Sequence, residues 1–312
     1  MKKNIYSLTV LISIAILTIN IFTKSKQLTS IIIFSINLFI KNIFPTLFPM
    51  FIISHLLVEI GIPEFLGSKF NKLFIHLFKT TPYSSFVFFM SLITGFPSSA
   101  KYVNDLIEKN KINNNEAEKI LKFTFFSNPL FIINTIGISF LHNKKIGLYI
   151  LISHILGNII TGIILNKKDK IYKEIKLFTY RDLIEKTNDS SIIKTLLTAI
   201  KNSLDILINI FGLITFSLIV SNITINNPNN YIKVLITGLI EMTTGLKYLS
   251  TLSIPFKLKV LTSTLFISFG GLSIHAQIIN ILKEKKVKYL PFLISRIIHS
   301  IISSIIIYIL IS

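Results

Sequence analysis

The sequence has no cysteine and no tryptophan, and only 15% of its 312 residues are charged. The absence of cysteine excludes disulfide bonds and metal sites built on thiolates. The small charged fraction argues against a soluble protein, because soluble domains carry about a quarter charged residues. The hydrophobic fraction is 51% and the mean hydropathy is +0.67. These values favour an integral membrane protein.

Long apolar runs recur along the whole chain and leave no room for a soluble domain of ordinary size. A helix needs about 20 apolar residues to cross a bilayer. Segments 5–22, 146–165, 203–223 and 290–311 meet that length with few or no ionisable residues. We interpret 5–22 as a retained first helix, since its apolar part is longer than that of an ordinary signal peptide. The predicted fold class is an all-α polytopic membrane protein.

Basic residues outnumber acidic residues by 33 to 14, but their placement argues against nucleic acid as a partner. The lysines fall in the gaps between apolar segments, as expected for loops on the cytoplasmic side of a membrane. The densest groups are 166–201 and 283–288. With both inside, the inside loops hold 18 Lys and Arg and the outside loops hold 4, which predicts the orientation.

Polar residues, glycine and proline interrupt the membrane segments at four places. In the first half these are Gly95–Lys101 and Ser127–Pro129, and in the second half Thr237–Gly245 and Phe269–Gln277. Backbone freed by such a break cannot face lipid, so it is buried in protein or lines a hydrated cavity. Helix N-termini at the breaks would present free N–H groups that suit an anion or a carboxylate.

Each half has a long helix, a broken region and a closing helix, and each crosses the membrane an odd number of times. Inverted repeats with discontinuous helices are typical of secondary transporters. We therefore expect an inverted repeat. The predicted domains are an N-terminal helix with a short loop (1–30), a first repeat (31–165), a basic cytoplasmic connector (166–201) and a second repeat (202–312).

Several of these residues also have simpler interpretations. Glu241 would lie near the membrane surface if it pairs with Lys247, and His275 would be a core histidine if a backbone carbonyl accepts its proton. Lys101 is equally suited to reach the headgroups. These alternatives stay open at the level of sequence.

Four motifs in order resemble the family of the sporulation integral membrane protein YlbJ, or SpoVV, within the nucleoside-recognition or Gate domain group. They are Phe44–Phe51, Gly95–Lys101, Ser127–Phe131 and Ser268–Gln277. The resemblance implies an architecture similar to concentrative nucleoside transporters. It also implies a role in spore-forming Firmicutes, in which dipicolinic acid is moved across the outer forespore membrane. Ser99 departs from the glycine expected in the family's motif.

The resemblance further implies which residues bind substrate. Helix N-termini, hydroxyls and amides would donate hydrogen bonds to the two carboxylates of dipicolinate, and Lys101 would supply charge. Glu241 would repel this small anionic solute, so we expect it to bind a coupling proton or sodium ion. The expected substrate-binding residues are Gly95, Pro97, Ser98, Ser99, Lys101, Ser127, Asn128, Thr243, Thr244, Gly270, Gly271, Ser273, His275 and Gln277.

Two other functions remain open: a carrier of nucleosides or other small metabolites, and a non-transporting membrane scaffold for spore assembly. An enzyme is not expected, because the sequence has no metalloprotease, nucleophile-elbow or P-loop motif. No catalytic residue, cofactor or metal is predicted. The expected partners are the lipid bilayer and the solute, and a homo-oligomer stays open.

Overall fold

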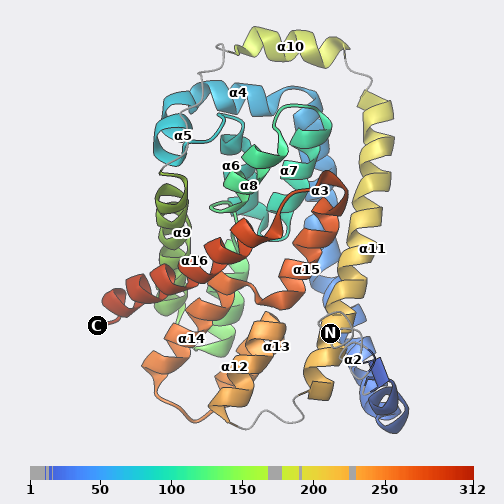
Figure 1. The fold of residues 1–312 in the computed structure, drawn as a ribbon, viewed down its shortest axis with the longest axis vertical. Helices are drawn as coiled ribbons and strands as arrows, with labels where there is room; N and C mark the ends of the chain where they lie inside the picture. Colours follow the sequence, from blue (N-terminus) through green and yellow to red (C-terminus); the bar gives the residue numbers. More distant parts are fainter. Residues whose placement is uncertain (1–10, 12–13, 16, 168–177, 190–191, 225–229) are drawn as a thin grey trace, which may run out of the picture.

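The computed structural model describes residues 11, 14–15, 17–167, 178–189, 192–224 and 230–312. Every secondary-structure element in these ranges is helical, so the predicted all-α fold class is confirmed. The chain winds around a central group of short helices, with longer helices at the periphery (Figure 1).

Five apolar helical segments are long enough to cross a membrane, which supports an integral membrane protein. Three of them are single unbroken helices: α9 (Lys144–Asn166), α11 (Ile192–Thr224) and α16 (Tyr289–Leu310). The other two are composite. One consists of α2 (Ser25–Leu38), η1 (Phe39–Ile43) and α3 (Phe44–Glu59), and the other of α14 (Phe256–Phe269), α15 (Gly271–Leu282) and η3 (Lys283–Lys285).

The remaining helices of the described ranges are short. α6 (Ser84–Thr94), η2 (Phe131–Phe140) and α12 (Tyr231–Ile240) are apolar, but at 1.5 Å per residue each reaches only about half of a bilayer core. The others are α4 (Ile62–Lys69), α5 (Asn71–Phe78), α7 (Ser98–Glu108), α8 (Asn114–Leu121), α10 (Tyr180–Asp189) and α13 (Met242–Thr251).

The helix boundaries differ from the expected ones at two places. α2 begins at Ser25 directly after a turn at Lys24, so the loop expected up to residue 30 is helical. In the basic connector, residues 168–177 and 190–191 lie outside the described ranges. Its described part contains α10, and α11 already begins at Ile192, before the expected boundary at 202.

The four predicted breaks are all present. α6 ends at Thr94 and α7 begins at Ser98; residues 124–128 have no helical structure; α12 ends before Glu241; and α14 ends before Gly270. The breaks occur where glycine, proline or a capping polar residue interrupts an apolar run. The repeat relationship between the two halves stays a prediction.

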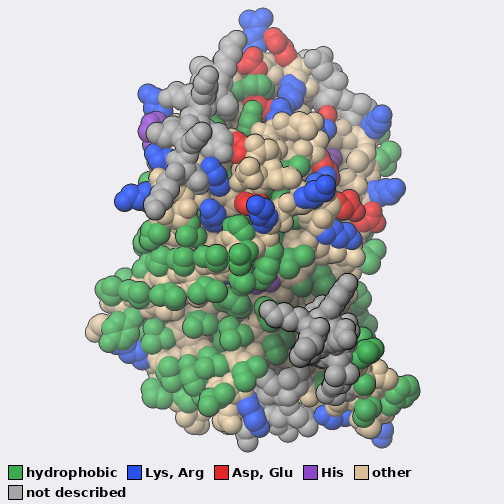
Figure 2. All heavy atoms as spheres, in the orientation of Figure 1, with side chains coloured by type: hydrophobic (Ala, Val, Ile, Leu, Met, Phe, Trp, Pro, Cys, Tyr) green, Lys and Arg blue, Asp and Glu red, His purple; other side chains and the backbone are tan. Residues whose placement is uncertain are grey.

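Charged residues gather at one end of the molecule. Figure 2 shows most blue and red side chains of this face at the end that carries α4 and α10, above a broad hydrophobic region. Ion pairs there join segments distant in sequence: Glu64 with Lys111 and with Lys186 (2.9 Å), and Glu108 with Lys285 (3.2 Å). The loops that the lysine distribution places on one side of the membrane therefore do lie together.

Candidate functional site

The two breaks of the first half meet each other. Gly95 has φ +82°, a conformation that residues with a side chain rarely adopt. A Cβ atom there would lie 2.5 Å from the Asn128 backbone nitrogen, so glycine permits the close approach. Asn128 connects the two helix ends, because its Nδ2 donates to the Ile93 carbonyl at 3.3 Å and its Oδ1 accepts from the Leu130 N–H at 2.9 Å.

A non-helical segment, residues 124–128, follows α8 and runs through the interior. Its backbone cannot hydrogen-bond within a helix, and Phe125 is fully buried, so its polar groups need other partners. The side chains of α9 supply two. Asn158 Nδ2 donates to the Phe125 carbonyl, and the Ser127 N–H donates to His154 Nε2 at 3.0 Å. His154 Nδ1 then donates to the Ser268 hydroxyl at 3.1 Å, which joins the segment to α14.

Arg296 of α16 holds the chain just before this segment and is itself fully buried. Its Nη2 donates to the Lys122 carbonyl at 2.5 Å, and its Nη1 donates to Asn158 Oδ1 at 3.1 Å and His299 Nδ1 at 3.0 Å. A guanidinium only donates, so His299 accepts there. Within the described residues no carboxylate forms an ion pair with Arg296. Its charge is held by neutral acceptors and by the Phe125 ring, 4.7 Å away.

The first break of the second half is organised by Glu241. Its carboxylate caps α13 by accepting from the N–H groups of Thr243 (3.2 Å) and Thr244 (2.7 Å) and from the Thr243 hydroxyl (2.7 Å). Carboxylates stabilise helix N-termini in this way. Glu241 is 5% exposed. The alternative pairing with Lys247 is not formed among the described residues, and Lys247 lies over the Phe34 ring.

The second break of this half lies at Gly270 and Gly271, which have φ of +92° and +70°. A Cβ atom on Gly271 would lie 3.1 Å from the Met242 nitrogen, so this break touches the one at Glu241. His275 follows on α15. Its Nε2 donates to the Phe269 carbonyl at 2.8 Å and its Nδ1 accepts from the Tyr289 hydroxyl at 2.8 Å. This arrangement matches the interpretation of His275 as a packed core histidine.

Phe125 lies between the broken regions of the two halves. Its ring stacks on Phe96 of the first break, with centroids 4.7 Å apart. A Cβ atom on Gly270 would lie 2.4 Å from Phe125 Cζ. The four breaks, which are far apart in sequence, are therefore contiguous around Phe125, Glu241 and Asn128.

Lys101, the cation expected to bind substrate, is engaged with another residue. It is 1% exposed, and its ammonium group contacts both carboxylate oxygens of Asp105, with Nζ–Oδ2 at 2.6 Å. Asp105 is 2% exposed. His55 Nδ1 of α3 approaches Asp105 Oδ1 at 3.4 Å. In this conformation the positive charge of Lys101 is balanced inside the protein.

Two discontinuous helices pack together and carry the predicted serines. α7 packs against α15, and the first turns of these helices hold Ser98 and Ser99, and Ser273. All three are buried. In the described part of the chain, the Ser99 and Ser273 hydroxyls have no hydrogen-bond partner. Each is thus free to donate to a ligand. Gln277 is also buried on α15.

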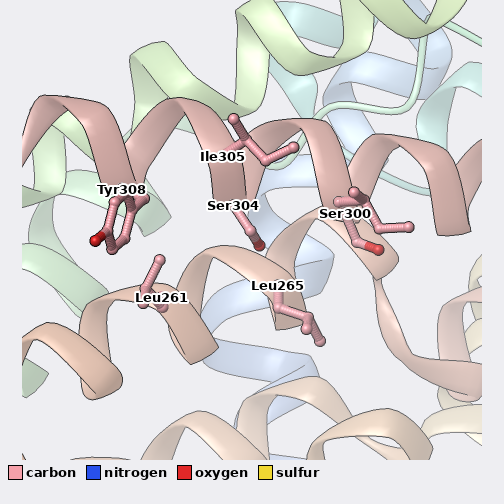
Figure 3. A pocket seen from close by; sticks show the side chains of 7 residues that line it. Leu261, Leu265, Ser300, Ser304, Ile305 and Tyr308 are labelled. Carbon is pink, nitrogen blue, oxygen red and sulfur yellow. The ribbon is translucent and has the colours of Figure 1, made fainter.

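An open groove of about 360 Å³ lies elsewhere, between α14 and α16 (Figure 3). Its lining is almost wholly apolar, with Leu261, Leu265 and Tyr308 beside Ser300 and Ser304. None of the predicted site residues lines it. Its composition does not suit a charged solute, so we do not assign it to the candidate site.

Comparison with known proteins agrees with the motif resemblance. The chain is 26% identical over 300 aligned positions to the sporulation integral membrane protein YlbJ of Bacillus subtilis (strain 168), covering 86% of this chain and 74% of the relative. The predicted resemblance to the YlbJ family is confirmed. No family model matches the chain, and the comparison with solved structures gives no significant match.

The interruptions of the apolar runs identified the breaks but not the side chains that support them. His154, Asn158, Arg296 and Asp105 were missed. Arg296 carried a signal, because a charged residue inside an apolar segment is unusual and marks a functional or structural site. Asp105 also carried one, since it lies four residues after Lys101 and on the same helix face. His154 carried the same signal as Arg296, because it is an ionisable residue inside the apolar segment 146–165. Asn158 had no comparable signal, and the partners of both residues lie in a segment distant in sequence.

Proposed function

We propose that this protein is a secondary transporter of a small aromatic dicarboxylate, dipicolinate, in the outer forespore membrane of a sporulating bacterium. The observation that carries the proposal is the meeting of four interrupted helices around buried polar groups. Similarity to a sporulation membrane protein supports the biological setting. The inverted repeat and the Gate-type architecture belong to the same proposal.

The chemistry of the packed α7 and α15 ends suits carboxylates. Both helices begin inside the protein, so their first N–H groups and positive dipole ends favour an anion. The Ser99 and Ser273 hydroxyls lack partners in the described structure, and an unsatisfied buried hydroxyl is unfavourable unless a ligand accepts its hydrogen bond. A rigid dicarboxylate would provide acceptors at two points.

The decisive experiment complements a Bacillus subtilis strain that lacks YlbJ with this chain and measures dipicolinate in spores and mother cells. Transport predicts that the chain restores spore dipicolinate. Normal insertion of the chain with spores still empty of dipicolinate, while the mother cell accumulates it, would refute the proposed substrate.

Point variants distinguish a transporter from a scaffold. Ser99→Ala and Ser273→Ala should each lower dipicolinate uptake by purified protein in vesicles about tenfold, the loss expected for one hydrogen bond to a charged group. Ser139→Ala changes an exposed serine of η2 and should leave uptake unchanged. Full complementation by both buried variants would favour a scaffold. Uptake of uridine in place of dipicolinate would favour a nucleoside carrier.

A further inference from the structure

Lys101, Asp105 and His55 form a buried group of three ionisable side chains between α7 and α3. The Asp105 carboxylate accepts from Lys101 and is 3.4 Å from His55 Nδ1. We propose that Asp105 is a proton-binding site, and that protonation of Asp105 releases Lys101 to bind the anionic substrate. This inference rests on the proposed function and names its coupling ion. It assigns the proton to Asp105 and not to Glu241, whose carboxylate is engaged in capping α13.

The positions of the three residues permit this exchange. Side chains on a helix lean toward its N-terminus and cover the preceding turn. Lys101 instead reaches one turn forward to Asp105. Without that ion pair, its ammonium group would fall back over the first turn of α7, where Ser98 and Ser99 lie. The candidate site at Ser98 and Ser99, which lacks a cation in this conformation, would then gain the ammonium group of Lys101.

Because the Lys101–Asp105 pair is buried, anion binding by Lys101 and protonation of Asp105 are strongly coupled. An ion pair inside a protein is stable only while both charges are present, and removing one leaves a costly unpaired charge. If Lys101 turns to a bound carboxylate, Asp105 is left buried without its partner and takes up a proton, because burial disfavours the charged form. Anion and proton therefore bind together, and each strengthens the binding of the other.

His55 offers a route for the proton. It lies on α3 one helical turn before Glu59, whose carboxylate pairs with Lys109 at the charged end of the molecule. A hydronium ion at that end first gives a proton to His55 Nε2. The proton on His55 Nδ1 then passes to Asp105 Oδ1: the N–H bond breaks as the O–H bond forms, and His55 is left neutral.

Other ionisable groups face this part of α7, and most are already engaged. α6 has none. His275 of α15 bonds Tyr289 and Phe269, and Glu116 of α8 bonds its own helix cap. Tyr102 of α7 donates to the Thr94 hydroxyl, Glu108 pairs with Lys285, and Glu118 of α8 accepts from the Lys288 N–H. Lys119 also lies on α8.

The test is titration calorimetry of the purified full-length protein in two buffers of different ionisation enthalpy, with dipicolinate and isophthalate as dianions and uridine as a neutral solute. Between about pH 6 and pH 8 both dianions stay fully charged. The proposal predicts uptake of close to one proton per dianion and about tenfold tighter binding for each unit by which the pH falls.

Variants assign the proton. Asp105→Asn should bind the dianion without proton uptake and without pH dependence. Glu59→Gln, which alters the ion pair one turn away, should behave as the unchanged protein. If Asp105→Asn does not fold, the double variant Lys101→Met with Asp105→Asn replaces both charges, a change that buried pairs often tolerate. It should lose the proton uptake and most of the affinity.

The outcomes separate this inference from the proposed function. Dipicolinate binding without proton uptake, or uptake that persists in Asp105→Asn, overturns the proton site alone. Isophthalate binding with Asp105-dependent uptake, and no dipicolinate binding, overturns the substrate alone. Binding of uridine and of neither dianion overturns both.

Discussion

At the residue scale, Asn158 holds two buried groups at once. Its amide group donates to the Phe125 carbonyl and accepts from Arg296. Asn158→Leu leaves the Phe125 carbonyl and one N–H of Arg296 buried without the partner that Asn158 supplied, and each such group costs about 1–3 kcal/mol. We expect a lower free energy of unfolding, measured by thermal unfolding in detergent.

Asn134→Leu is the matched control for this change. Asn134 is exposed on η2, so its replacement should leave stability nearly unchanged. Equal destabilisation by the two substitutions would contradict the role assigned to Asn158.

Gly270 should tolerate no side chain. Its φ is +92°, and a Cβ atom would lie 2.4 Å from the Phe125 ring. Backbone strain and overpacking each cost about 1–3 kcal/mol, so Gly270→Ala should unfold at a clearly lower temperature. Gly212→Ala on α11 adds a Cβ atom that meets no other described part of the chain within 4 Å, so it should instead stabilise the protein by about 0.5–1 kcal/mol. A similar loss in both variants would refute this explanation.

At the scale of elements, Glu64 ties α4 to the end of α7 and to α10 through Lys111 and Lys186. Burial raises the pKa of Glu64, but the two ammonium groups outweigh burial and hold the pKa below its usual 4.5. The ion pairs therefore stabilise the fold above pH 4.5, and this contribution is lost as the pH falls through the lowered pKa.

Glu64→Gln tests this contribution. The variant should be less stable than the unchanged protein at pH 7, and the difference should shrink on acidification below about pH 4.5. Circular dichroism during acid titration measures it. A difference that grows as the pH falls would show that the sign is wrong.

The breaks between elements were predictable because they depend on local chemistry. Gly95, Pro97 and Gly270 cannot continue a helix without a distortion, and they stand out in apolar surroundings. The partners of the freed backbone were not predictable. His154 and Asn158 reach residues 124–128 only because α9 folds back along that segment, and no local pattern encodes this contact. Glu241 was predicted to matter, but its capping of α13 depends on a backbone turn that the sequence does not reveal.

At the scale of the whole molecule, the membrane orientation is open to a direct test. The natural chain has no cysteine, so one introduced thiol reports its own side of the membrane. Lys283→Cys lies in an expected inside loop and Lys145→Cys in an expected outside loop; both positions are exposed. An impermeant maleimide applied to intact, non-sporulating cells that carry the chain in the cell membrane should label only the second.

Labelling of both positions from the same side would contradict the predicted number of crossings. Labelling of Lys283→Cys alone would show that the chain has the opposite orientation in the membrane. The ion pairs that join Glu64, Lys111 and Lys186 would keep the charged end together in either case.

The non-helical segment at residues 124–128 also has a mechanical consequence. α9 holds it through Asn158 and His154, α16 holds a neighbouring carbonyl through Arg296, and the two helices pack directly against each other. α9 and α16, the closing helices of the two halves, are thus bonded to one short non-helical stretch of chain and form a single frame. Any motion that opens the interior alternately to the two sides has to occur as other helices, α7 and α15 among them, move against that frame.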